Sequence, residues 1–539
     1  MRQVSWVSCH PRKWGPARET RIVLRQPWGC KPVLPHNLKT AGGCQNWVAL
    51  AIETAFMLGF ASVRYWPDYL YLHQTATMSE FRMAAEPESK GAFSIWRAVG
   101  PAIITASVVL GPGSILSASK IGYQHGYAMV WVLAFASLMM IGMMALSARL
   151  GVVLKGTLCD ELARRDGRWV AVITGVSLFL IAACFQFGNN LGVLAAIDPF
   201  LPQADPSSTG VSIVGAIKLA VIVGLNLIII VALIGFKELY KPIELLMKAM
   251  VTLMMIAFAA NLVMAQPDLL ELLAGLVPIL PEGAANTLFP QIEEAAMHGD
   301  VVVAPARMTD NLTPVIAMFA TTFSIAGAFY QSYLVRKKGW TLANLREGLV
   351  DSAVGVAVLG LVSLMIMVTA AAVLHGRDDV GELGSAADVA RQLAPLFGNS
   401  ATVLFCLGIF AGAFSSFLVN AMIGGTMLSD GIGLGGDIDQ RWPKVFTVLA
   451  LMIGMGVAIY VEATGLRPVN LIIFAQAMTV LGLPALAIAM LRLATLSDLR
   501  GDKAVPWILK FVALVAVVIV IFLAVRTCIV LYFKLFMAT

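Results

Sequence analysis

The chain has 539 residues, of which 59% are hydrophobic and only 13% are charged, and its mean hydropathy is +0.82. This composition supplies too little polar surface for a soluble protein of that length, so we exclude a soluble multi-domain protein and expect lipid as the solvent. The formal charge of +6 does not indicate a nucleic-acid partner, because Lys and Arg collect in the cytoplasmic loops of membrane proteins.

The first 92 residues differ in composition from the remainder. Residues 1–77 are rich in Trp, Arg and Pro and have one short apolar stretch at 47–60 without a clear cleavage site, so we predict no signal peptide. Met78 begins a short polar leader of the kind that precedes a first membrane helix. We therefore expect 1–92 to be a disordered or mis-started extension and 93–539 to form the transmembrane domain.

Apolar runs long enough to cross a bilayer recur from residue 95 to the end of the chain. They predict eleven helical spans, at 95–120, 126–150, 168–195, 211–235, 243–265, 312–338, 348–374, 397–428, 444–463, 468–492 and 506–532.

Charge sets the orientation of these spans. Lys and Arg occupy alternate loops, at 149–168, 237–241, 336–338, 441–444 and 492–503. The loop at 266–311 carries seven acidic residues against the single Arg307. By the positive-inside rule the N-terminus is cytoplasmic and the C-terminus is outside, in a multi-pass plasma membrane protein of bacterial type.

Two spans contain residues that weaken a helix. The first is interrupted by Gly-Pro-Gly-Ser at 111–114, where Pro removes a backbone donor and Gly permits non-helical dihedral angles. The sixth has a softer interruption at Ala-Gly-Ala, 326–328, after the polar residues Thr321, Thr322 and Ser324. An inverted repeat of five helices places such breaks at the bilayer midplane, where free backbone groups form a small polar site.

Four stretches resemble the natural resistance-associated macrophage protein (Nramp) family of divalent metal transporters, between about Gly100 and Thr495. They are Gly100-Pro101 with 111–114, similar to the family's Asp-Pro-Gly-Asn site; Ala-Arg-Leu-Gly at 148–151 with Gly-Thr-Leu at 156–158; Gln-Leu-Ala-Pro-Leu-Phe-Gly at 392–398; and Asn470 through Gln476 to Leu483-Pro484. The resemblance implies an all-α polytopic membrane protein with a LeuT-type inverted repeat of 5+5 helices plus an eleventh, and alternating access of a metal ion at the two breaks.

The residues aligned with the family's metal site are uncharged. Gly111 stands where the family has its metal-binding Asp, and Ser114 stands where it has Asn. The sixth-helix Met-Pro-His-Asn becomes Ile-Ala-Gly-Ala at 325–328, which removes both the thioether and the imidazole. The tenth-helix Gln is kept as Gln476, whereas the eighth-helix Gln becomes Phe414.

The third-helix Asp and Glu, which the family uses in proton movement, align with Gln186 and Asn189. We expect these two amides to line the permeation path, with hydrogen bonds between helices as the alternative role. No Asp, Glu or His lies in the middle of any predicted span. Because proton coupling needs a buried group that changes its charge, we predict transport without proton coupling.

We therefore predict a secondary transporter for a divalent metal cation, with Mg²⁺ favoured over Mn²⁺. A neutral site made of oxygen atoms suits a hard cation that keeps several waters, and divergent Nramp-related magnesium transporters also lack the sixth-helix Met. The expected ion contacts are Gly111, Ser114, Thr322, Ala326 and Gln476. Of these, Ser114 and Gln476 would bind the metal, directly or through water.

A neutral cavity offers a divalent ion little to offset its dehydration, so a second hypothesis stays open. The chain would then be a degenerate Nramp-fold binding or sensing module, or a carrier of a non-metal solute. The sequence ends at Thr539, shortly after the last predicted span, which disfavours signalling because no effector domain follows.

We predict no enzymatic activity and no cofactor. The seven Cys contain no Cys-x-x-Cys pair, and the expected partners are the metal ion and the lipid bilayer, without nucleic acid. The sequence leaves the oligomeric state open. We expect the long side chain of Lys218, two turns into the fourth span, to extend to the outer interface.

Overall fold

The structure is a computed structural model of the whole chain. It describes residues 110–201, 213–235, 240–279, 291–293, 296–298, 301–304, 307–309, 312–377, 399–464 and 468–536. The expected extension at 1–92 and the first part of the first span lie outside these residues.

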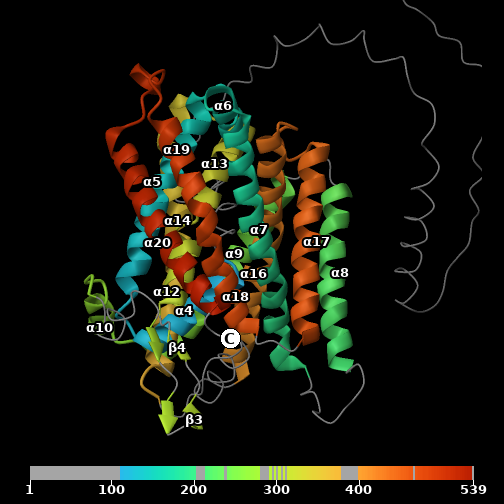
Figure 1. Cartoon of the computed structure of the whole chain (residues 1–539), viewed down its shortest axis with the longest axis vertical. Coiled ribbons are helices and arrows are strands. Elements are labelled where there is room, and N and C mark those ends of the chain that lie inside the picture. Colours follow the sequence, from blue (N-terminus) through green and yellow to red (C-terminus); the bar gives the residue numbers. More distant parts are fainter. Residues whose placement is uncertain are drawn as a thin grey trace, which may run out of the picture. The chain divides into compact units, whose positions relative to one another are not determined.

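Within the described ranges the protein is a bundle of membrane-length helices (Figure 1). Nine of the helices described are long and apolar enough to cross a membrane. The bundle contains α4 (Pro112–His125), α5 (Val130–Val153), α7 (Arg168–Ile197), α8 (Ile213–Gly235), α9 (Tyr240–Ala265), α12 (Thr313–Thr322), α13 (Ile325–Lys337), α14 (Leu345–Leu374), α16 (Asn399–Ile432), α17 (Arg441–Thr464), α18 (Pro468–Met478), α19 (Leu483–Ala494) and α20 (Trp507–Phe536).

Each of the eleven predicted spans corresponds to helical structure. The first is represented by α4, the sixth by α12 and α13 together, and the tenth by α18 and α19, which are joined by the 3₁₀ turn η3 (Thr479–Gly482). The predicted all-α polytopic fold, with five plus five spans and an eleventh appended, is confirmed.

The two ends of the bundle differ in charge. One end, here called the basic end, carries α6 (Leu158–Arg165), the end of α13 with Arg336 and Lys337, and the loop after α19. The opposite end carries α10 (Leu269–Ala274), 3₁₀ turn η1 (Asp198–Phe200) and the end of α20 (Figure 1). The basic end also holds 3₁₀ turns η2 (Leu342–Asn344) and η4 (Gly501–Lys503).

Four short strands lie in the loop before α12, which the sequence analysis did not anticipate. They are β1 (Gln291–Glu293), β2 (Ala296–His298), β3 (Val301–Ala304) and β4 (Arg307–Thr309). β1 pairs with β4 and β2 with β3, both antiparallel, with Gln291 opposite Thr309 and His298 opposite Val301. These ladders are confined to one loop and leave the helical fold class unchanged.

The long helices α7 and α16 pack directly on one another through glycines. A Cβ atom at Gly175 of α7 would lie 2.6 Å from the Met427 carbonyl oxygen, and one at Gly431 of α16 would lie 2.6 Å from the Ala171 carbonyl oxygen. Small residues let helix backbones approach closely in membranes, where the hydrophobic effect does not drive helix association. This glycine contact forms the fixed frame beside which the broken helices lie.

The side chain of Lys218 of α8 extends to the end of the bundle opposite the basic end, where it contacts two carboxylates. Its Nζ atom lies 2.9 Å from Asp198 Oδ1 and 3.1 Å from Glu462 Oε1. Asp198 follows α7 and Glu462 is near the end of α17. The ammonium group therefore ties α8, which otherwise exposes much of its apolar surface, to two neighbouring helices.

Candidate functional site

The first predicted break is a helix start inside the bundle. Gly111 is the N-cap of α4 with extended backbone angles (φ −84°, ψ 172°), and Pro112 occupies the first helical turn. The Gly111 carbonyl oxygen accepts hydrogen bonds from the amides of Ser114 at 3.1 Å and Ile115 at 3.3 Å. Proline is suited to this position because its missing N–H has no acceptor at a helix start anyway.

Two glycines hold this break in place. A Cβ atom at Gly192 of α7 would lie 2.2 Å from Pro112 Cβ, and one at Gly412 of α16 would lie 2.8 Å from the Leu110 carbonyl oxygen. Contacts that short cannot exist, so only glycine allows α7 and α16 to approach the break from either side. The start of α4 therefore packs closely against both α7 and α16.

The second break lies at Phe323 and Ser324, and the predicted position at 326–328 is wrong. α12 ends at Thr322, Phe323 and Ser324 have non-helical ψ angles of 61° and 85°, and α13 begins at Ile325. Ser324 Oγ accepts a hydrogen bond from the Gly327 amide at 3.2 Å. A serine hydroxyl caps a new helix well, so the polar residue forms the break and Gly327 is part of the helix that follows.

The predicted contact residues lie on elements that meet. Ser114 is in the first turn of α4, Thr322 is the last residue of α12, and Ala326 is in the first turn of α13; all three are buried. α12 packs against both α4 and α18, and α18 also packs against α4. Gln476 lies within α18, and its side chain is outside the described part of the structure.

Gln186 and Asn189, predicted to line the path, are fully buried and form a chain of hydrogen bonds. Gln186 Nε2 donates to the Phe417 carbonyl oxygen of α16, and Asn189 Nδ2 donates to Gln186 Oε1 at 3.1 Å. Among the residues described, none is a hydrogen-bond partner of Asn189 Oδ1. An unsatisfied buried acceptor costs about 1–3 kcal/mol, so this oxygen is a place where a ligand or water would be favoured.

The next residue, Asn190, faces a different neighbour. Its Oδ1 accepts from Asn226 Nδ2 of α8 at 2.8 Å, and its own Nδ2 donates to the Gln186 backbone carbonyl at 2.9 Å. Gln186 and Asn190 therefore both make hydrogen bonds between helices, the alternative role given for the polar residues of this span, and the permeation-path role of Gln186 and Asn189 stays a prediction. Asn190 joins α7 to α8 through its hydrogen bond with Asn226, whereas the Oδ1 atom of Asn189 has no hydrogen-bond partner among the described residues.

Sequence reasoning missed Ser416, Gly192 and Gly412. A Cβ atom at Gly111 would lie 3.3 Å from Ser416 Oγ, which places that hydroxyl beside the first break. The signal for the two glycines is present in the sequence, since Gly188 and Gly192 in α7, and Gly408 and Gly412 in α16, each have the Gly-x-x-x-Gly spacing of close helix contacts.

In the described structure, the central parts of the helices beside the two breaks carry no Asp, Glu, His, Lys or Arg. α12 and α18 contain none, α7 has none between Arg168 and Asp198, and α16 has none before Asp430. Among the residues described, no group of three or more His, Cys, Asp or Glu could hold a metal ion. Any ion at this site would meet amide, hydroxyl and backbone oxygens alone.

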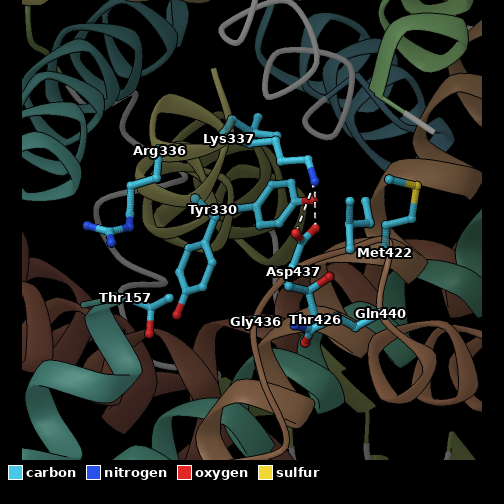
Figure 2. A pocket seen from close by; sticks show the side chains of 12 residues that line it. Thr157, Tyr330, Arg336, Lys337, Met422, Thr426, Gly436, Asp437 and Gln440 are labelled. Atoms are coloured by element: carbon cyan, nitrogen blue, oxygen red, sulfur yellow. Dashed lines mark hydrogen bonds and ion pairs between the residues drawn. The ribbon is translucent and has the colours of Figure 1, made fainter. Parts of the chain in front are cut away.

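A cavity of about 470 Å³ lies at the basic end, lined by side chains of α13, of α16 and of the loop after α16 (Figure 2). Lys337 Nζ lies 2.8 Å from Asp437 Oδ1 and 2.8 Å from Asp439 Oδ2, so an ion pair joins the end of α13 to the loop after α16. The lining residues are Thr157, Tyr330, Tyr333, Leu334, Arg336, Lys337, Met422, Thr426, Gly436, Asp437, Ile438 and Gln440.

Two lining residues of this cavity lie on helices that also carry residues near the two breaks. Met422 lines it and is six residues from Ser416, a distance of about 9 Å along a helix. Tyr330, which also lines it, is on α13, five residues after the start of the helix that follows the second break. The cavity therefore lies on the basic-end side of both breaks.

Comparison with known proteins identifies relatives over most of the chain. Residues 102–530 match the family described as natural resistance-associated macrophage protein-like, Nramp. The divalent metal cation transporter MntH of Deinococcus radiodurans is 26% identical over 403 residues, 75% of this chain and 83% of that protein. A protein of the same name from Klebsiella pneumoniae (strain 342) is 25% identical over 407 residues, 75% of this chain and 87% of that protein.

Among solved structures, the crystal structure of the Eremococcus coleocola manganese transporter in complex with an aromatic bis-isothiourea substituted compound is similar. The TM-score is 0.63 at 16% sequence identity, and the match covers 84% of this chain and 90% of that one. At this identity the likeness shows a shared fold.

Proposed function

This chain belongs to the Nramp family of divalent metal transporters, and we propose that it moves a divalent metal cation, Mg²⁺ ahead of Mn²⁺, by alternating access without proton coupling. The names of the relatives support a metal ion as the substrate, since two are named divalent metal cation transporters and one is named a manganese transporter. The preference and the absence of coupling are argued from the residues of this chain.

The observation that carries the proposal is the uncharged site at two broken helices. α12 ends at Thr322 inside the bundle, so its last carbonyl groups lack partners within the helix and hold about half a negative charge. Backbone carbonyls of this kind, with the oxygens of Ser114, Thr322 and Gln476, would replace part of a cation's water shell. Hard oxygen ligands favour Mg²⁺, which keeps several waters, over softer metals.

The absence of Asp, Glu and His from the described central parts of α7, α12, α16 and α18 supports uncoupled transport. A carrier couples proton and metal movement only if a buried group gains and loses a proton during the cycle. Without that coupling the cation moves down its own electrochemical gradient. A membrane potential of 100 mV is worth about 2.3 kcal/mol per charge, or about 4.6 kcal/mol for a divalent ion, which suffices to drive uptake.

Flux into proteoliposomes tests the proposal. The full chain is reconstituted with an internal pH dye and offered Mg²⁺, Mn²⁺, Ca²⁺ or Zn²⁺ at a set potential. We expect Mg²⁺ uptake that rises with an inside-negative potential and is not accompanied by acidification. Ser114→Ala combined with Gln476→Ala should abolish the uptake.

Thr464→Ala is the matched control, because the Thr464 hydroxyl donates only to carbonyls of its own helix, at Tyr460 and Val461, on an exposed turn. Acidification that follows metal entry would show that the carrier is proton-coupled. If no divalent ion moves, calorimetry with small amines and amino acids decides whether the protein binds a non-metal solute instead.

A further inference from the structure

We propose that Asn189 of α7 and Ser416 of α16 are oxygen ligands of the cation site, which would then be completed by the fixed helices α7 and α16. The substrate class is a divalent cation that keeps part of its water shell. This inference rests on the proposed function and adds two ligands to it. It is carried by the approach of both side chains to Gly111.

The first step concerns the space at Gly111. A Cβ atom at this position would lie 3.3 Å from both Asn189 Oδ1 and Ser416 Oγ. The room into which a longer residue would extend is thus bounded by two side-chain oxygens from two different helices. Gly111 has no side chain of its own at the first break, and the amide oxygen of Asn189 and the hydroxyl of Ser416 border the space instead. Both groups can accept a hydrogen bond from water or bind a cation.

The second step fixes which atom of Asn189 faces the break. The Phe417 carbonyl can only accept, so Gln186 must present its amino group there and its oxygen to Asn189. Asn189 must then present its amino group to Gln186 Oε1, and its own oxygen is left toward Gly111. The orientation of both amides follows from one backbone carbonyl, and it gives the break an oxygen.

The third step concerns the hydrogen bonding of Asn189 Oδ1. Asn189 is fully buried, and its amino group has a hydrogen-bond partner whereas its Oδ1 has none in the described part of the chain. Thr322 Oγ1, at the end of α12, is a second buried side-chain oxygen without a partner. Buried acceptors in native proteins are normally satisfied, so unpaired oxygens on helices that contact α4 indicate a ligand or its water.

The experiment measures Mg²⁺ affinity of the full chain, by calorimetry in detergent and by uptake into liposomes with a magnesium-sensitive dye. The variants are Asn189→Leu, Asn189→Asp and Ser416→Ala. The matched control is Asn190→Ala, since Asn190 is the adjacent residue but bonds to Asn226 and the Gln186 backbone. Folding is checked by size-exclusion profile and thermal melting.

We expect Asn189→Leu to weaken Mg²⁺ binding about tenfold or more, and Ser416→Ala to weaken it about threefold. Asn190→Ala should stay within about twofold of the unaltered protein. The nearly isosteric Asn189→Asp should strengthen binding about tenfold at neutral pH, because it adds a negative charge at the site. That gain should disappear as the pH falls and the new carboxylate takes up a proton, a dependence that a purely structural role would not produce.

If Mg²⁺ affinity is unchanged in both Asn189→Leu and Asn189→Asp, the assignment of the two added ligands is overturned, and the proposed function is left intact. If Asn189→Leu does not fold, Asn189→Asp decides alone: a newly acquired pH dependence supports the assignment, and its absence overturns it. If the unaltered protein binds neither Mg²⁺ nor Mn²⁺, the proposed function fails first, and this inference falls with it.

Discussion

Glu161 is the buried carboxylate of α6, at the basic end. Its Oε1 accepts from the Gly156 amide at 3.1 Å, its Oε2 accepts from Arg165 Nε at 3.1 Å, and Arg164 pairs with it as well. Burial raises the pKa of the Glu161 carboxyl, but the hydrogen bonds from Arg164, Gly156 and Arg165 outweigh it and lower the pKa to about 2. The short helix is therefore anchored by an ionised group.

Glu161→Gln should remove a pH dependence of stability. Because the folded pKa of about 2 lies below the ordinary value of 4.5, the carboxylate stabilises the fold above pH 4.5 and loses that effect as pH falls toward 2. The substitution should cost about 1–3 kcal/mol at pH 7 and less at pH 3. Thermal melting at both pH values measures this, with the exposed Asp502→Asn as control; parallel losses at both pH values would contradict it.

The broken helix α4 depends on the shape of its neighbours more than on its own sequence. A helix that starts inside a membrane leaves amides unpaired, so its start must be held against other elements. Gly192 and Gly412 provide the room for this on the two sides of the break. Further along the same two helices, Gly175 and Gly431 let α7 and α16 pack closely on one another.

Gly192→Ala should therefore damage the site, whereas the same change in another membrane helix should not. A Cβ at Gly192 would lie 2.2 Å from Pro112 Cβ, so either α7 or the start of α4 must shift, at about 1–3 kcal/mol. Gly224→Ala in α8 is the control, because nothing lies within 4 Å of its Cβ position. We expect lower thermal stability and lost metal uptake only for Gly192→Ala; equal melting temperatures would show that the break tolerates displacement.

At the scale of the whole molecule, the ion pairs of the described residues lie at the two ends of the bundle, while Asp351 of α14 and Arg526 of α20 are buried charged side chains. The basic end carries Arg164, Arg165 and Arg492, which pair with Glu161, Asp498 and Asp166. The opposite end holds Lys218 with Asp198 and Glu462. Pairing lowers the cost of holding these charges next to lipid.

The excess of Lys and Arg at the basic end predicts the orientation in the membrane. We expect this end to face the cytoplasm and the C-terminus to lie outside. Alkaline phosphatase fused after Thr539 should then be active in a bacterial host, and a green fluorescent protein fused there should be dark. The same reporters inserted at Gly339, in the turn after α13, should give the opposite result. Matching signals at both sites would show that the topology is wrong.

Hydropathy and charge along the chain were sufficient to predict the spans, their alternating direction and the first break. These features depend on local properties: a bilayer requires about 20 apolar residues per helix, and Pro112 between glycines interrupts a helix in most surroundings. The neutral character of the site could also be read directly, because the aligned positions contain no ionisable residue.

Only the tertiary structure decided which residues meet. The second break is at Ser324 because its hydroxyl caps α13 by accepting a hydrogen bond from the Gly327 amide. The sequence offered both Ser324 and Gly327 as places for the break, and it did not show which of them would form it. Asn189 and Asn190 are adjacent and identical in type, yet one faces Gly111 and the other faces Asn226, since successive residues of a helix point about 100° apart. Ser416 is 305 positions from Gly111, and no local pattern relates them; the contact exists because α7 and α16 enclose the start of α4.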